Sequence, residues 1–363
     1  MKVQFSTPDK MTRIATSQLE NVSLFPLLES GLVYGSPLAI SRAQWPQRLS
    51  GVEEDFMVNI KTILCPVDFF PASEAAVSYA TGLAANHEAT IHLLHVITPI
   101  AAGAYEYAIH TAEIVASMEE RSMEEMNRLV ARIRAKGVVA EPEVRFGDVY
   151  DEIKQDIEMV KPDLILMGTH GRRGVERWFM GSTTEKLLRH SPVPLVTISA
   201  AGEKSWAEPQ FKRILVTTDF AEGTADALAY AFSVARENDS EVVLLHVLHD
   251  VSMDSLGRYR DVLIGGVRKQ LEDLVPPEAV NWYDVVTRVE TGVPYRMILR
   301  AIEDERPDLL VMNIHGKGML DRALLGSTAE RVVRAASCPV MMIPPMKRKL
   351  KRRARPGGTR VAA

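Results

Sequence analysis

The sequence predicts an α/β protein built from two tandem doubly wound domains, each with a five-stranded parallel sheet and helices on both faces. Three observations carry this prediction: the chain contains an internal duplication, short apolar runs alternate with helical patterns in both copies, and the apolar runs have no polar side. Strands that are apolar on both sides belong to parallel sheets covered by helices on each face. A length of 363 residues is sufficient for two such domains.

Two blocks of the chain repeat each other, and they establish the duplication. Residues 61–96 match residues 212–247 at an offset of 151, with 13 identities in 36 positions. Residues 162–194 match residues 307–339 at an offset of 145, with 13 identities in 33 positions. The second copy is therefore six residues shorter between the two blocks, in or beside its second helix.

The elements of the first copy follow in order from its periodicity. An apolar run leads into a Phe-Phe-Pro-Ala-Ser turn, after which Ala76, Tyr79, Ala80 and Leu83 recur at helical spacing. Short apolar runs and helical patterns then alternate to the end of the copy. Strands are expected at 61–67, 90–97, 138–146, 163–168 and 194–198, and further helices near 108–136, 148–160 and 182–190.

The second copy repeats this order. Strands are expected at 212–217, 241–248, 283–290, 308–314 and 339–343, and helices at 223–237, 255–275, 293–305 and 327–336. The two copies define expected domains at 57–200 and 212–345, joined by a short linker at 201–211.

The two ends of the chain lie outside the repeats. Residues 1–56 contain four prolines and no sustained periodicity, so a poorly ordered extension is expected, and Met57 offers an alternative start. Residues 346–363 carry eight Lys or Arg and no acid within a total charge of −4, so residues 1–345 carry −12. A body of that sign is a poor nucleic-acid binder, and only the basic tail, expected to be disordered, suits an anionic partner.

Composition excludes several further classes of protein. With 46% hydrophobic and 25% charged residues, the chain is neither disordered nor collagen-like. Two cysteines, Cys65 and Cys338, cannot build a disulfide framework and favour a cytoplasmic location, with Cys65 a buried thiol in the first strand. No apolar run reaches the roughly 18 residues that a membrane span needs.

Candidate binding residues cluster where strands of the first copy end. Asp68 follows the first strand, Val96 lies at the end of the second, and Gly168 and Gly171 follow the fourth. Gly181, Ser182 and Thr183 then open a helix. Ligands of open parallel sheets bind beyond the carboxyl ends of the strands, at the point where the strand order reverses.

Each of these residue types suits a nucleotide. An aspartate can accept hydrogen bonds from ribose hydroxyls or an adenine amino group, glycines allow close backbone approach, and a helix N-terminus attracts phosphate. Two structural alternatives remain open: Asp68 could cap the following helix, and the glycines could serve only as turn residues.

The pattern Gly168-x2-Gly171-x9-Gly181-Ser182, downstream of Asp68, resembles the ATP-binding signature of the universal stress protein family. The resemblance extends over 58–199 and 208–345. It implies a flavodoxin-like or Rossmann-like fold, an adenine nucleotide such as ATP, with or without Mg²⁺, and pairing through the last strand.

The second copy departs from this signature at one position. Asn313 replaces the first glycine, and its side chain is expected to occupy space that phosphates or ribose need, which weakens the site. The other candidate positions are retained: Asp219, Val247, Gly316, Gly326 and Ser327.

The final strands, 194–199 and 339–343, are short apolar edges that need covering, so the two copies are expected to pair through them. The leading hypothesis is a cytoplasmic, ATP-binding, regulatory stress protein with an unidentified protein partner; a homodimer remains open. The alternatives are a ligand-free interaction module and a slow ATPase that autophosphorylates on Ser182 or Thr183. The chain has no Gly-x4-Gly-Lys-[Ser/Thr] loop, and no catalytic residue is expected.

No metal site is expected from the sequence. His92 and His95 are three residues apart in a strand, which places their side chains on opposite faces. His246 and His249 have no apparent third ligand nearby in the sequence. Methionines at helical spacing are expected in the core: Met118, Met123 and Met126.

Overall fold

The computed structural model describes residues 58–98, 108–169, 180–199, 211–221, 223–236, 238–249, 260–276, 279, 284–314 and 325–344. The expected extension at 1–56, almost all of the linker and the basic tail lie outside this part of the chain. The strands are β1 (Thr62–Val67), β2 (Thr90–Ile97), β3 (Ala140–Phe146), β4 (Leu164–Gly168), β5 (Leu195–Ile198), β6 (Arg213–Thr217), β7 (Glu241–Leu248), β8 (Asp284–Thr291), β9 (Leu309–Asn313) and β10 (Val340–Ile343). The helices are α4 (Pro71–His87), α5 (Ala108–Arg134), α6 (Val149–Val160), α7 (Ser182–His190), α8 (Thr224–Arg236), α10 (Arg260–Leu274), α12 (Pro294–Glu305) and α13 (Ser327–Ala335).

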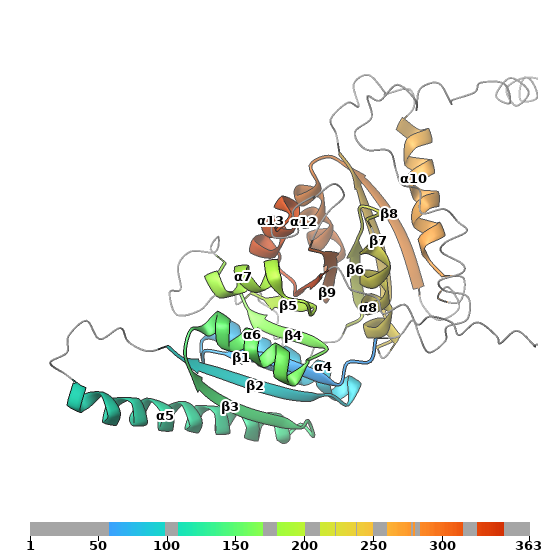
Figure 1. The fold of residues 1–363 in the computed structure, drawn as a ribbon. Helices are drawn as coiled ribbons and strands as arrows, with labels where there is room; N and C mark the ends of the chain where they lie inside the picture. Colours follow the sequence, from blue (N-terminus) through green and yellow to red (C-terminus); the bar gives the residue numbers. More distant parts are fainter. Residues whose placement is uncertain are drawn as a thin grey trace, which may run out of the picture. The chain divides into compact units, whose positions relative to one another are not determined.

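The α/β fold class is confirmed, and the two expected sheets join into one. The strands run in the order β3-β2-β1-β4-β5-β10-β9-β6-β7-β8, parallel within each half (Figure 1). The halves meet where β10 pairs with β5 in antiparallel register, with Met341 opposite Val196. Both strands are fully buried four-residue segments, so each covers the edge that the other would expose.

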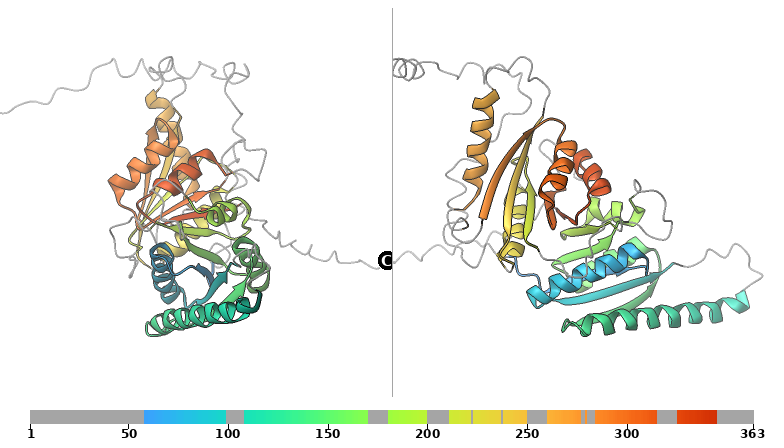
Figure 2. Two further views of the ribbon diagram at one scale, coloured as in Figure 1. Left: turned by 90° about the vertical axis from the view of Figure 1, so that its left-hand side faces the viewer. Right: turned by 180° about the vertical axis from the view of Figure 1, so that it is seen from behind.

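The strand order places a switch point between β1 and β4. From β1 the chain proceeds outward through β2 to β3, then crosses back to β4 and continues to β5. Right-handed crossovers therefore place α4 and α5 on one face and α6 and α7 on the other. Figure 1 shows α6 and α7 in front of the sheet, and the view from behind in Figure 2 shows α4 and α5.

Contacts away from the sheet also join the two copies. The rings of Tyr79 and Phe211 meet edge to face with centroids 5.1 Å apart, and the Tyr79 hydroxyl donates to the carbonyl of Asp308 at 3.4 Å. The Asn86 amide donates to Oδ1 of Asn238 at 2.8 Å. Burial raises the pKa of Tyr79 well above its usual value, so this hydroxyl remains a donor.

A repeated aspartate organises the start of the first strand in each copy. Oδ2 of Asp163 accepts the backbone N–H groups of Lys61 and Thr62 at 2.8 and 2.9 Å. Asp308 does the same for the backbone of residues 212 and 213, at 2.8 and 3.1 Å. The repeated Pro-Asp-Leu sequence therefore has a structural role at the amino edge of the sheet.

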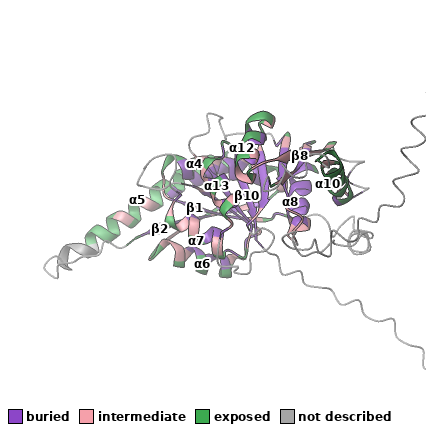
Figure 3. Ribbon diagram, turned by 90° about the horizontal axis from the view of Figure 1, so that it is seen from above, coloured by how far each residue is buried: buried purple, intermediate pink, exposed green. Residues whose placement is uncertain are grey.

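The expectation for the methionines of α5 was only partly right. Met126 is fully buried and Met118 half-buried, but Met123 is exposed. The exposed side chains of Ile114 and Val115 lie in the N-terminal half of the helix, which Figure 3 colours largely green. The helical spacing was correct, but the buried residues of α5 begin at Met126, so only its last turns pack closely on β2 and β3.

Candidate functional site

The loop between β1 and α4 holds Asp68 at the carboxyl edge of the sheet. Oδ1 of Asp68 accepts the backbone N–H of Phe70 at 3.1 Å, which closes a turn through Phe69 at a left-handed φ of 63°. The Phe69 ring packs on His95 at 4.4 Å, and Nδ1 of His95 lies 2.8 Å from the Val67 carbonyl. Helix α4 is capped by Phe70 without a side-chain hydrogen bond, so Asp68 shapes the turn and does not cap the helix.

Gly168 ends β4 next to Asp68, because β1 and β4 are parallel neighbours. A Cβ at Gly168 would lie 2.7 Å from the carbonyl carbon of Ala72 and 2.8 Å from its Cβ. No side chain fits at that distance, so the first turn of α4 requires a glycine here. The expected reason, close approach of phosphate, is therefore not needed to explain Gly168.

Gly181 differs from Gly168 in this respect. It caps α7 with a φ of −61°, and a Cβ there would meet Thr169 O at 3.5 Å and Thr184 Oγ1 at 3.7 Å, which are ordinary contacts. Neither backbone conformation nor packing by the described residues demands a glycine. An absent side chain at this position leaves room above the first turn of α7.

The N-terminus of α7 lies at the same edge. The backbone N–H of Gly181 donates to the Thr169 carbonyl at 2.9 Å, which anchors the helix start to the end of β4. Among the described residues no side chain caps this helix, so within that part of the chain the first amides, including those of Ser182 and Thr183, lack a side-chain acceptor. Ser182 is exposed and Thr183 half-buried.

Val96 completes the edge from β2. It lies one residue beyond the pair formed by Val67 and His95, so it is level with Asp68. Val96 is buried and supplies an apolar side chain. Gly171, the remaining residue of the predicted site, lies outside the described residues, as does Gly316 of the second copy.

The second copy builds the same edge. Oδ1 of Asp219 accepts the backbone N–H of Ala221 at 3.0 Å across Phe220, whose φ is 60° and whose ring packs on His246 at 4.6 Å. Gly326 caps α13 without a side-chain hydrogen bond. The other predicted residues take equivalent positions: Val247 near the end of β7 and Ser327 at the start of α13.

Asn313 does not point where the sequence suggested. Its side chain packs on Gly223, the counterpart of Ala72, and a Cβ on Gly223 would lie 2.9–3.3 Å from the Asn313 amide atoms. With the amide oriented to satisfy both of its groups, Nδ2 donates to the Gly223 carbonyl at 3.0 Å and Oδ1 accepts the Thr224 N–H at 3.3 Å. In the first copy the glycine is Gly168 on the strand, whereas in the second copy it is Gly223 beside the helix. The Asn313 amide is therefore directed at α8.

Sequence reasoning missed a second polar cluster, formed by His92, Glu143 and Asp156. These residues come from β2, β3 and α6, and no short motif connects them. The expected separation of His92 from His95 is seen, because His95 contacts Val67 and Phe69 instead.

A tandem pair of α/β domains, each with an aspartate and a helix N-terminus at its switch point, places the chain in the class of doubly wound α/β proteins. Within that class, the chain belongs to the universal stress protein family, whose model matches residues 59–199 and 210–344.

The relatives include universal stress proteins that match both copies and others that match one. A universal stress protein of Mycolicibacterium smegmatis is 27% identical over 299 residues, spanning 78% of this chain and 97% of the relative. One from Methanocaldococcus jannaschii is 33% identical over 143 residues, which is 38% of this chain and 84% of the relative. The crystal structure of a universal stress protein from Archaeoglobus fulgidus matches with a TM-score of 0.58 and 24% identity, over 78% of this chain and 98% of that one, and supports the fold.

Of the helices that the structure describes, none is both long and apolar enough to cross a bilayer.

Proposed function

We propose that this universal stress protein is a regulatory module that binds an adenine nucleotide, ATP above all, at the carboxyl edge of its first domain, with Mg²⁺ accompanying the phosphates. We also infer domain limits of 57–200 and 212–345. One observation carries the proposal: an aspartate and an uncapped helix start meet at a switch point, beside a glycine that the described residues do not require.

Each predicted site residue would contact a different part of the nucleotide. The second carboxylate oxygen of Asp68, which has no hydrogen-bond partner among the described residues, would accept ribose hydroxyls or the adenine amino group. The apolar side chain of Val96 would contact the base. The open amides and hydroxyls of Ser182 and Thr183 would bind phosphate oxygens, favoured by the positive end of the helix dipole. Gly171 would complete this phosphate contact.

The proposal extends to the second domain. The Asn313 side chain was expected to occupy the space of the phosphates or ribose. Its amide instead faces Gly223 and Thr224. Asp219, Val247, Gly326 and Ser327 keep their positions at the edge. Two nucleotides per chain are therefore expected, with Gly316 serving as the counterpart of Gly171.

The first test introduces an acid where phosphate would bind. Ser182→Glu and its matched variant Ser327→Glu each place a carboxylate at an exposed first-turn position, where it stabilises the helix and repels phosphate. Calorimetric titration with ATP, ADP and AMP, with and without Mg²⁺, should show about two sites in the wild type and one in each variant. Melting temperatures of the variants no lower than that of the wild type would show that the loss is local.

The other outcomes identify the alternatives. One site, lost only in Ser182→Glu, would confine the proposal to the first domain. No binding, and no nucleotide released when the purified protein is denatured and analysed by mass spectrometry, would favour a ligand-free interaction module. Phosphate release from bound ATP over hours, or phosphorylation of Ser182 or Thr183, would indicate a slow ATPase.

A further inference from the structure

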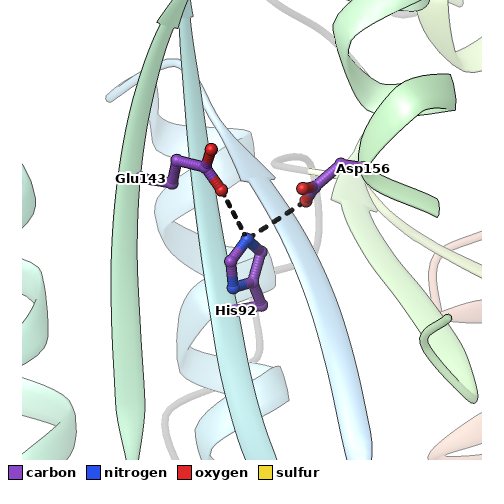
Figure 4. A group of neighbouring side chains, drawn as sticks. All are labelled: His92, Glu143 and Asp156. Carbon is purple, nitrogen blue, oxygen red and sulfur yellow. Dashed lines mark hydrogen bonds and ion pairs between the residues drawn. The ribbon is translucent and has the colours of Figure 1, made fainter. Parts of the chain in front are cut away.

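The geometry points to a binding site for a divalent transition-metal cation, best fitted by Zn²⁺, formed by His92 Nε2, Glu143 Oε2 and Asp156 Oδ2 in the first domain (Figure 4). These three atoms lie within 4.8 Å of one another. The site is separate from the proposed nucleotide edge, since His92 pairs with Leu64 inside the sheet, whereas Asp68 lies beyond the carboxyl end of β1.

The distances between the ligand atoms suit a small cation. His92 Nε2 lies 3.0 Å from Glu143 Oε2 and 3.2 Å from Asp156 Oδ2. Ligands bound tetrahedrally at about 2.0–2.1 Å are separated by about 3.3 Å, so a slight expansion would admit the ion. One imidazole nitrogen with two carboxylates favours Zn²⁺ or its first-row neighbours over Mg²⁺ and Ca²⁺, which prefer oxygen ligands alone.

A buried carboxylate oxygen of Asp156 is directed at the other two ligand atoms of this cluster. Asp156 is fully buried, yet its Oδ2 accepts no hydrogen bond from the described residues. A proton on His92 Nε2 is directed at Glu143, and one N–H cannot also satisfy Asp156. Its contact with His92 Nε2 at 3.2 Å is an ion pair only when the imidazole is protonated, whereas a cation contacts all three ligand atoms at once.

The surrounding charges orient the ligands and leave a negative balance. The Arg145 guanidinium donates to the opposite oxygens, Glu143 Oε1 and Asp156 Oδ1, both at 2.6 Å. These two hydrogen bonds turn Glu143 Oε2 and Asp156 Oδ2 toward His92, as hydrogen-bond partners of metal ligands commonly do. Glu152 and Glu141 lie 3.8 Å from Arg145 and His92 respectively. With His92 neutral, these groups sum to −3, which suits a divalent ion.

The second domain shows that the fold does not need this cluster. At the positions of His92 and Asp156 it carries Val243 and Ala301, both buried. Glu143 is replaced there by Arg288, a cation in its own right that pairs with Glu290, Asp304 and Glu305. The same β-β-α packing is therefore built without the half-buried histidine and the buried aspartate, so stability of the fold alone does not explain them.

The test uses the second domain as the template for the control. The full chain is stripped with a chelator, and Zn²⁺ binding is measured by competition with a chromophoric chelator, without nucleotide. The wild type is expected to bind one Zn²⁺ per chain. The affinity of the double variant His92→Val/Asp156→Ala should be lower by more than about 100-fold, since even changes to residues behind the metal ligands cost about 10–100-fold. Co²⁺ should give a visible ligand-field spectrum in the wild type only.

Stability measurements keep the test decisive. Zn²⁺ should raise the melting temperature of the wild type and leave that of the double variant unchanged. If the double variant fails to fold, Asp156→Asn, which preserves side-chain shape, takes its place in the same assays. Absence of Zn²⁺ and Co²⁺ binding in the wild type, or equal binding in the variant, would overturn the proposal. Neither result bears on nucleotide binding, because no nucleotide is present.

Discussion

Gly168 and Asn313 occupy equivalent positions, and each is matched to the helix turn that it faces. Gly168 faces Ala72 across a gap too small for any side chain, whereas Asn313 fills the space left by Gly223 and hydrogen-bonds the start of α8. A departure from a motif is therefore informative only together with the residue that it contacts. In this chain, that partner is about 90–100 residues away in the sequence.

This pairing predicts a strong coupling between two substitutions. Gly168→Ala should destabilise the protein by about 1–3 kcal/mol, because its Cβ would overlap Ala72. Ala72→Gly should recover part of that loss, with a coupling energy of about 0.5–3 kcal/mol. Urea unfolding of the two single variants and the double variant measures the cycle. Additive effects would show that the contact at 2.8 Å with the Cβ of Ala72 does not limit this position.

Cys65 is predicted to be unreactive while the protein is folded. Burial raises the pKa of its thiol to about 12, so the thiolate that reacts with disulfide reagents is almost absent at pH 8. In a Cys338→Ala background, a chromogenic disulfide reagent should label no thiol in native protein and one in denaturant. Cys65→Val, which copies Val216 of the second domain, should leave the fold intact. Rapid native labelling that speeds up steeply between pH 7 and 9 would contradict this.

At the scale of elements, periodicity predicted the strands and helices because apolar spacing reports which face of an element is buried. It also placed Asp68, Gly168 and Gly181 at one edge, since parallel strands end together. It could not identify Ala72 as the residue that excludes a side chain at Gly168. Nor could it assemble the cluster of His92, Glu143 and Asp156, whose members lie on three elements and meet only after the sheet and α6 have packed.

At the scale of the whole sheet, the antiparallel pairing of β5 with β10 makes the two domains one hydrogen-bonded unit. Every side chain of these two strands is buried, so separating the strands would expose an apolar sheet edge to water. The domains should therefore unfold together, although each has its own core.

A charge placed in this junction should separate the two domains. Met341 is 1% exposed and lies opposite Val196, so Met341→Lys would bury an unpaired ammonium at a cost of several kcal/mol. Scanning calorimetry should show one transition for the wild type and two for the variant. Met341→Leu, which preserves volume and apolarity, serves as the control and should retain a single transition.

The reversal of strand direction between β5 and β10 also determines where the two candidate edges lie. Because the strands of one half run opposite to those of the other at the junction, their carboxyl ends lie on opposite borders of the sheet. The edge with Asp68 and the edge with Asp219 therefore face different surroundings and cannot share one ligand. A change at one edge can reach the other through the backbone ladder that joins the halves and through the contacts of Tyr79 and Asn86 with the second copy.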